Sequence, residues 1–245
     1  MGTKPIKSIS ARLAAAQTAI VNTLADQEIL IMVAVNGYTV EKMNEGKARY
    51  EIAQDAVNAQ IAATGAQYQS TALLKIAEAD AHGAYQAIAK VARAIFIKDK
   101  PRLAELGLTG KMPRATADFT TAGYAVFDNA LKVPEIKSAL NAYGYDEPKL
   151  QSERAKIAAY DSADKAQEVA KGTAQQATVD QDKALAEMNE WLSKYIKIAR
   201  VALQDKKQLL EKIGIRARTS KTAAQRGASK KAAATRAAKK KSKGS

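Results

Sequence analysis

The sequence of 245 residues contains no cysteine and only one histidine, His82. Without cysteine the chain can form neither a disulfide framework nor a zinc site built from thiolates. No apolar run approaches the roughly 18–20 residues that a helix needs to cross a bilayer. The sequence therefore predicts no membrane span, and the absence of cysteine fits a reducing compartment. We expect a cytoplasmic protein, with association with a nucleoid as a further expectation.

Motifs that carry chemistry are also missing. There is no Gly-rich phosphate loop and no nucleophile elbow. A di-iron bundle would require two Glu-x-x-His motifs, and the chain has none. Glu78 lies one helical turn before His82, which is more typical of a helix surface than of a catalytic or metal site. We therefore predict a protein that is not an enzyme and needs no metal or cofactor.

The chain does contain an internal sequence repeat at an offset of 107 positions. The segment Ile88–Leu108 aligns without a gap to Tyr195–Ile215, and Gly37 and Gly65 recur as Gly144 and Gly172. A constant offset over such a span indicates a tandem duplication, so the fold is expected to consist of two equivalent units.

Apolar residues fall at helical spacings of three and four along both copies, and aromatics make up only 5% of the chain. This pattern is typical of long, closely packed helices. We predict an all-α fold: a duplicated unit of about 107 residues with three long antiparallel helices, arranged as two three-helix bundles or as one six-helix body. The expected domains are repeat 1 (1–108), repeat 2 (109–215) and a tail (216–245). The sequence leaves open whether the helices bend at Gly65 and Gly172 or continue through them.

Several residues predict where helices end. Gly37 supplies the left-handed conformation that follows a last helical turn, and Thr39 can cap the next helix. Gly144 and Asp146 occupy the same two positions in the second copy. Pro134 is expected to interrupt the first helix of that copy.

The third predicted helix of each copy carries an apolar stripe, or seam, along one side, and the two seams differ in the size of their residues. Small residues such as Ala81 and Ala84 in the first copy correspond to Met188 and Trp191 in the second. One explanation is that the two seams face each other. Arg93 and Arg200 share a repeat position. They could form an anion-binding pair, but packing along the bundle or pairing with a carboxylate is the favoured interpretation.

The net charge of +14 is concentrated at the C-terminus. Residues 216–245 contain eleven basic residues, no acidic residue and no large apolar residue. Such a segment cannot bury enough surface to fold alone, so we predict a disordered basic tail. The predicted phosphate-binding residues are Arg216, Arg218, Lys221, Arg226, Lys230, Lys231, Arg236, Lys239, Lys240, Lys241 and Lys243.

Polycations of this kind bind nucleic acid by releasing condensed counterions, with little sequence reading. No aromatic residue is interleaved, so duplex DNA or structured RNA is a better target than single strands. In composition alone, the tail resembles the C-terminal tails of linker histones and bacterial histone-like proteins. We predict a sequence-independent nucleic-acid-associated protein whose helical body presents the tail or self-associates into a homo-oligomer. The alternative is a self-assembling scaffold whose tail is an accessory anchor to an anionic surface.

Overall fold

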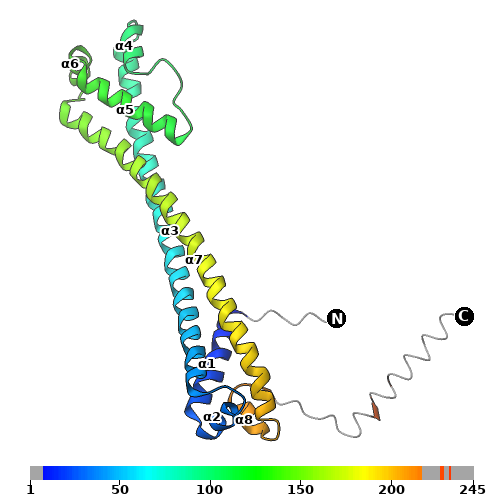
Figure 1. Cartoon of the computed structure of the whole chain (residues 1–245). Coiled ribbons are helices and arrows are strands. Elements are labelled where there is room, and N and C mark those ends of the chain that lie inside the picture. The colour runs from blue at the N-terminus through cyan, green and yellow to red at the C-terminus, as the bar shows by residue number, and fades with distance from the viewer. Residues whose placement is uncertain (1–7, 217–226, 229–231, 233–245) are drawn as a thin grey trace, which may run out of the picture. The chain divides into compact units, whose positions relative to one another are not determined.

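The computed structural model describes residues 8–216, 227–228 and 232, and α-helix is the only regular secondary structure in that part of the chain. The predicted all-α class is confirmed. None of the described helices combines the length and apolar character needed to cross a membrane. The helices (Figure 1) are α1 (Ile9–Ala25), α2 (Gln27–Ala34), α3 (Val40–Ile95), α4 (Lys100–Glu105), α5 (Thr116–Lys132), α6 (Pro134–Asn141), α7 (Glu147–Ala202) and α8 (Lys207–Lys212).

The helix boundaries repeat along the chain. Every bound of α1 to α4, shifted by 107 positions, gives the corresponding bound of α5 to α8. The expected subdivision into three long helices per copy is wrong, because each copy has one 56-residue helix and three shorter ones. α3 continues through Gly65 and α7 through Gly172. A helical glycine costs only about 1 kcal/mol relative to alanine, which is too little to end a helix of this length.

The predicted helix ends are confirmed. Gly37 and Gly144 have φ angles of 85° and 82°, as required after the last turn of a helix. Asp146 accepts a hydrogen bond from the Lys149 amide at 3.0 Å and so caps α7. Pro134 occupies the first position of α6, just after α5 ends.

The sequence did not predict the break between α1 and α2. It falls at Asp26, whose carboxylate accepts hydrogen bonds from the amides of Glu28 and Ile29 at 2.9 and 3.2 Å. The residue at the equivalent position in the second copy is Val133, which precedes Pro134 and has no side-chain cap. The same joint is therefore made by a capping carboxylate in one copy and by proline in the other.

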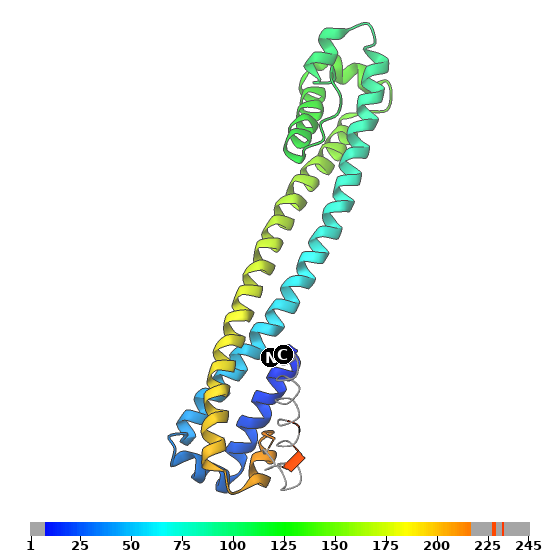
Figure 2. The same ribbon diagram turned by 90° about the vertical axis from the view of Figure 1, so that its right-hand side faces the viewer.

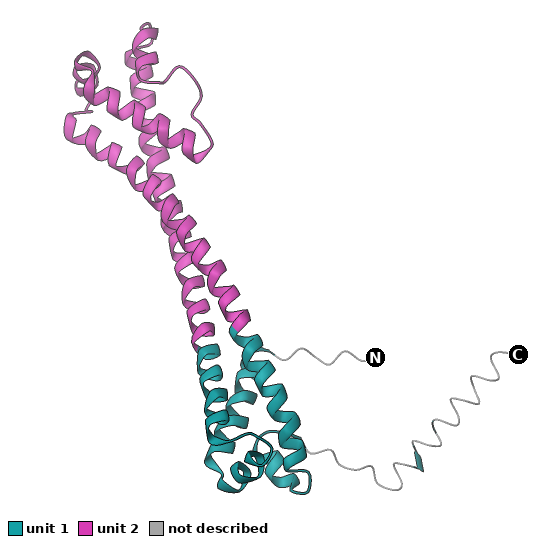
Figure 3. Ribbon diagram, in the orientation of Figure 1, with its two compact units in different colours: residues 1–54, 184–245 teal, residues 55–183 magenta. Residues whose placement is uncertain are grey.

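The chain divides into two compact units (Figure 3). Unit 1 comprises residues 1–54 and 184–245, and unit 2 comprises residues 55–183. Unit 1 holds α1, α2, α8, the start of α3 and the end of α7, and unit 2 holds the corresponding elements of the other copy. Each unit therefore combines helices from both sequence halves. The division into repeats at 1–108 and 109–215 stays a prediction about the sequence, and the predicted disorder of the tail concerns residues that lie almost entirely outside the described ones.

Within unit 2, the segments of α3 and α7 run side by side and antiparallel (Figures 1 and 2), and α5 packs against them. Phe119 and Phe127 of α5 and Ile88 of α3 are fully buried in this core. Ala81 and Ala84 belong to the same cluster, where Phe119 fills the space beside small seam residues.

Within unit 1, the large residue Trp191 of the second seam packs against α3 and not against the small residues of the first seam. Trp191 lies directly against Gly46 of α3, and its ring packs edge-on against Tyr38 and stacks on Tyr195. The suggestion that the two seams face each other is wrong, since Trp191 and Ala84 lie in the cores of different units. The residue that makes room for the indole is a glycine on the other long helix.

Candidate nucleic-acid interface

The packed part of unit 1 ends at Ile215, immediately before the predicted tail. Ile215 is buried, and its amide donates to the carbonyl of Leu210 at 2.9 Å, closing the end of α8 over Gly214. Arg216 follows and is exposed. It is the only predicted phosphate-binding residue whose position the structure describes. The other ten (Arg218, Lys221, Arg226, Lys230, Lys231, Arg236, Lys239, Lys240, Lys241 and Lys243) lie outside the described residues.

The helix before the tail is held to unit 1 by polar contacts as well as by buried leucine and isoleucine side chains. The Lys212 ammonium contacts the Asp26 carboxylate at 2.6 Å, and the Asn22 amide donates to the Lys212 carbonyl at 2.6 Å. Lys206 forms an ion pair with Glu28. These contacts fix the position of α8, which directly precedes the predicted tail in the sequence.

The Asp26 carboxylate is also the group in this region with a clear electrostatic perturbation. The hydrogen bond from Lys212 lowers the pKa of Asp26 below its ordinary value, and the backbone amides of Ile29 and Glu28 add to the effect. The charged form of Asp26 is therefore favoured in the folded protein, and it neutralises one lysine of α8.

Charge is distributed unequally between the units. Unit 2 contains sixteen basic and sixteen acidic residues, so its net charge is zero. The described part of unit 1 contains eleven basic and nine acidic residues, and the chain after Arg216 adds ten basic residues and no acidic one. With Lys4 and Lys7, which precede the described residues, the net charge of +14 belongs entirely to the sequence of unit 1.

Among the cations of unit 1, the distance to the nearest carboxylate decides which are neutralised. Six of the eleven in the described part have a carboxylate within 4 Å: Lys42, Lys47, Arg49, Lys194, Lys206 and Lys212. Lys197, Arg200, Lys207 and Arg216 are exposed and, among the described residues, have no such carboxylate. Arg216 begins the predicted tail, and the other three lie within the twenty residues before it. They extend the basic segment into the folded body, which the sequence pattern did not reveal.

The two arginines that share a repeat position are used differently. In unit 2, Arg93 donates from Nε to the carbonyl of Leu108 at 3.3 Å and from its terminal nitrogen to the carbonyl of Gly110 at 2.9 Å. It thereby holds the loop that leads to α5. Arg200 in unit 1 is exposed. Arg93 therefore has a structural role, with two backbone carbonyls as partners in place of the expected carboxylate or packing along the bundle.

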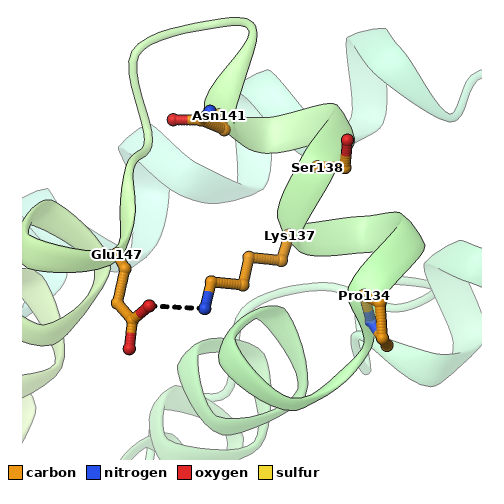
Figure 4. A pocket seen from close by; sticks show the side chains of 5 residues that line it. All are labelled: Pro134, Lys137, Ser138, Asn141 and Glu147. Carbon is orange, nitrogen blue, oxygen red and sulfur yellow. Dashed lines mark hydrogen bonds and ion pairs between the residues drawn. The ribbon is translucent and has the colours of Figure 1, made fainter.

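Two pockets are lined by charged side chains. One of the pockets of unit 2 has a volume of about 370 Å³ and is lined by Pro134, Lys137, Ser138, Asn141 and Glu147 (Figure 4). Its single cation is neutralised, because the Lys137 ammonium lies 2.5 Å from the Glu147 carboxylate. The second pocket, in unit 1, has a volume of about 160 Å³, and Arg49 and Lys194 on its wall pair with Glu187 and Glu190. Neither pocket presents an unpaired cation to a phosphate.

His82 belongs to an aromatic cluster in unit 2. Its ring lies 4.3 Å from that of Phe119 and 6.1 Å from that of Tyr160, both in edge-on arrangements. Within the described part of the chain, no group of three or more histidine, aspartate or glutamate side chains is placed to hold a metal ion. Residues 119 and 160 are far from 82 in the sequence, so no local pattern could have predicted this packing.

Comparisons with known proteins give no relative: no family model matches the chain, and neither a curated protein nor a solved structure is significantly similar to it.

Proposed function

We propose that this protein is a non-enzymatic, sequence-independent nucleic-acid-associated protein that binds the phosphate backbone through its basic C-terminal segment. The observation that carries the proposal is the run of eleven cations without an acid in residues 216–245, attached to a folded body at Ile215. A polycation of this length gains affinity for duplex DNA or structured RNA by displacing condensed counterions.

The folded body supports this assignment through its charge. Lys197, Arg200 and Lys207 are exposed, unpaired within the described residues and close in sequence to the tail. They add to the cationic character of the segment without adding donors that read base edges. Unit 2, which is neutral overall, contributes no net attraction to a polyanion.

The test is the binding of full-length protein to duplex DNA and to structured RNA across a salt series. Each neutralised phosphate contributes about −0.9 to the slope of log K against log salt concentration for duplex DNA. With up to eleven tail cations, we expect a slope on the order of −5 to −10. Removal of residues 217–245 should abolish most of this dependence. Retention of the full affinity by the truncated protein would contradict the proposal.

A matched variant separates charge from length. Replacing the ten basic residues after Arg216 with glutamine keeps the segment but removes its charge, and it should bind as weakly as the truncated protein. Replacing only Lys197, Arg200 and Lys207 with glutamine should weaken binding less than removal of the tail does, and it should reduce the magnitude of the slope by about 2 to 3. Far-UV circular dichroism of each variant checks that the helices are unchanged.

A second candidate function is favoured by a different observation. Residues 61–76 of α3 expose several large apolar side chains in unit 2, which is unusual for a surface helix. This is the pattern expected of a scaffold protein that self-assembles, with the tail as an accessory anchor to an anionic surface.

A further inference from the structure

One face of α3 in unit 2 is apolar and exposed. Ile61, Tyr68 and Ile76 retain 63%, 72% and 61% of their accessible surface. Gly65 and Ala72 lie between them at spacings of four, three, four and four, so that all five residues share one side of the helix. We call these five residues the α3 stripe.

Most of the stripe lies in a stretch of helix without charge. Residues 56–74 contain no acidic or basic residue, whereas the equivalent segment of α7, residues 163–181, contains five. Ile76 lies just beyond this stretch, directly after Lys75. The large residues of the stripe, Ile61, Tyr68 and Ile76, correspond in α7 to Glu168, Gln175 and Lys183. A long helix of this repeat can therefore be built with polar residues at these positions, and the apolar side chains of α3 are not required for the helix itself.

The order of residues in the stripe is the same in both directions. Outward from Tyr68 and Gln69, each direction meets a small residue (Gly65 or Ala72) and then an isoleucine (Ile61 or Ile76). A twofold axis between positions 68 and 69 would place Ile61 beside Ile76 of a second copy, and Gly65 beside Ala72. Such a surface is complementary to itself, as a symmetric homodimer requires. The small residues allow the two helix backbones to approach closely.

Charge also favours a second copy as the occupant. Two chains that each carry +14 repel one another wherever their basic segments meet. Unit 2 is neutral, with sixteen residues of each sign, and residues 56–74 are uncharged, so two copies can pair here with little repulsion. A polyanion, by contrast, would find only Lys75, at one end of this face of α3.

We infer that the α3 stripe is a homodimer interface in which α3 of one copy packs antiparallel against α3 of a second copy about a twofold axis near Tyr68. A stable interface usually buries about 800 Å² per partner. One helix face supplies only part of that area, so the dimer is expected to dissociate in the micromolar range. The inference does not depend on whether the tail binds nucleic acid. If both hold, the dimer carries two basic segments and can bridge two duplexes.

Sedimentation equilibrium of the full-length protein without nucleic acid, over about 1 to 200 μM in high salt, tests the inference. We expect reversible dimerisation that Tyr68→Glu weakens at least tenfold, since the interface would bury a carboxylate. Val169→Glu is the matched control, because Val169 is 71% exposed on α7 of the same unit, and it should leave dimerisation unchanged. A monomeric wild-type protein at the highest concentration, or equal effects of the two substitutions, would overturn the inference.

Cysteine cross-linking tests the axis itself. Because the natural chain has no cysteine, a single introduced cysteine is its only thiol. Gln69→Cys lies next to the inferred axis and should form disulfide-linked dimers on mild oxidation, since two such residues can come within the roughly 7 Å between Cα atoms that a disulfide tolerates. Gln176→Cys, at the equivalent exposed position of α7, should not. Equal cross-linking of both variants would exclude the proposed axis.

Discussion

Units 1 and 2 are built from corresponding helices of the two sequence copies, but different side chains fill their cores. Equivalent positions are buried in both units, for example Ile29 and Ile136, or Met43 and Leu150. The largest side chains, however, stand at different positions. The comparison shows that helix ends and buried positions define the backbone plan, whereas several combinations of large and small residues can complete it.

The pair Gly46 and Trp191 is the clearest example. A Cβ atom at position 46 would overlap the indole ring, so only glycine allows the two helices to keep their distance with tryptophan between them. In unit 2 the equivalent residues are Glu153 and Ala84, and Phe119 of α5 contributes the bulk to that core. Trp191 is the only tryptophan of the chain, so its fluorescence reports unfolding of unit 1 specifically.

The largest effect is expected for Gly46→Ala. The added methyl group should displace the Trp191 ring and lower the free energy of unfolding by about 1–3 kcal/mol. Denaturant unfolding followed by far-UV circular dichroism should show a lower midpoint, and adding Trp191→Leu should recover part of the loss. Gly65→Ala and Gly172→Ala are matched controls. Both glycines are helical and have open space around them, so alanine there should stabilise the helix by up to about 1 kcal/mol. A Gly46→Ala protein as stable as its parent would show that the close approach is not a constraint.

An effect in the same range is expected at the buried polar pair of unit 1. The Tyr195 hydroxyl hydrogen-bonds to Thr23, which itself donates to the carbonyl of Ala19 at 2.7 Å. Both side chains are fully buried, so Thr23→Ala should leave the tyrosine hydroxyl without a partner, at a cost of about 1–3 kcal/mol. The equivalent residues of unit 2, Ala130 and Ile88, are both apolar. Thr23→Ala combined with Tyr195→Phe should therefore destabilise less than the sum of the two single changes, as measured in a double-mutant cycle.

The same tyrosine gives a prediction at alkaline pH. Burial raises the pKa of Tyr195 to about 12, although the hydrogen bond with Thr23 opposes the shift. Because the folded pKa lies above the ordinary value of 10.0, the stability that Tyr195 contributes is complete below pH 10 and is lost as the pH rises toward 12. Tyr195→Phe should reduce the alkaline loss of stability seen by Trp191 fluorescence. An unchanged profile would assign that loss to other tyrosines.

The smallest effect is expected at Asp26, in acid. Its pKa is lowered in the folded protein, chiefly by the hydrogen bond from Lys212, so its contribution is present above the ordinary value of 3.8 and is lost as the pH falls through the folded pKa. Asp26→Asn keeps an oxygen for the amides of Glu28 and Ile29 but removes the charge. The variant should be slightly less stable than the parent at pH 7, and the difference should be smaller at pH 2. Fluorescence-detected denaturation at both pH values would measure it, and an equal difference at both would contradict the ionic origin.

The sequence by itself determined the all-α class and the helix ends that glycine, proline and capping residues mark. Gly37, Gly144 and Asp146 act through local backbone conformation and local hydrogen bonds, which a short window of sequence reveals. The basic character of residues 216–245 is likewise a property of composition. The sequence left open whether α3 bends at Gly65 or continues through it, because one glycine changes the free energy of a helix too little to predict its end.

Tertiary structure decided which helices share a core and which cations stay unpaired. Continuous helices place the start of one repeat and the end of the other in the same unit, so that Trp191 meets Gly46 and His82 meets Phe119. Whether Arg200 or Lys212 is neutralised depends on how far its charged group lies from a carboxylate elsewhere in the chain. Burial and charge pairing depend on distances between residues far apart in sequence, and these are fixed only when the helices pack.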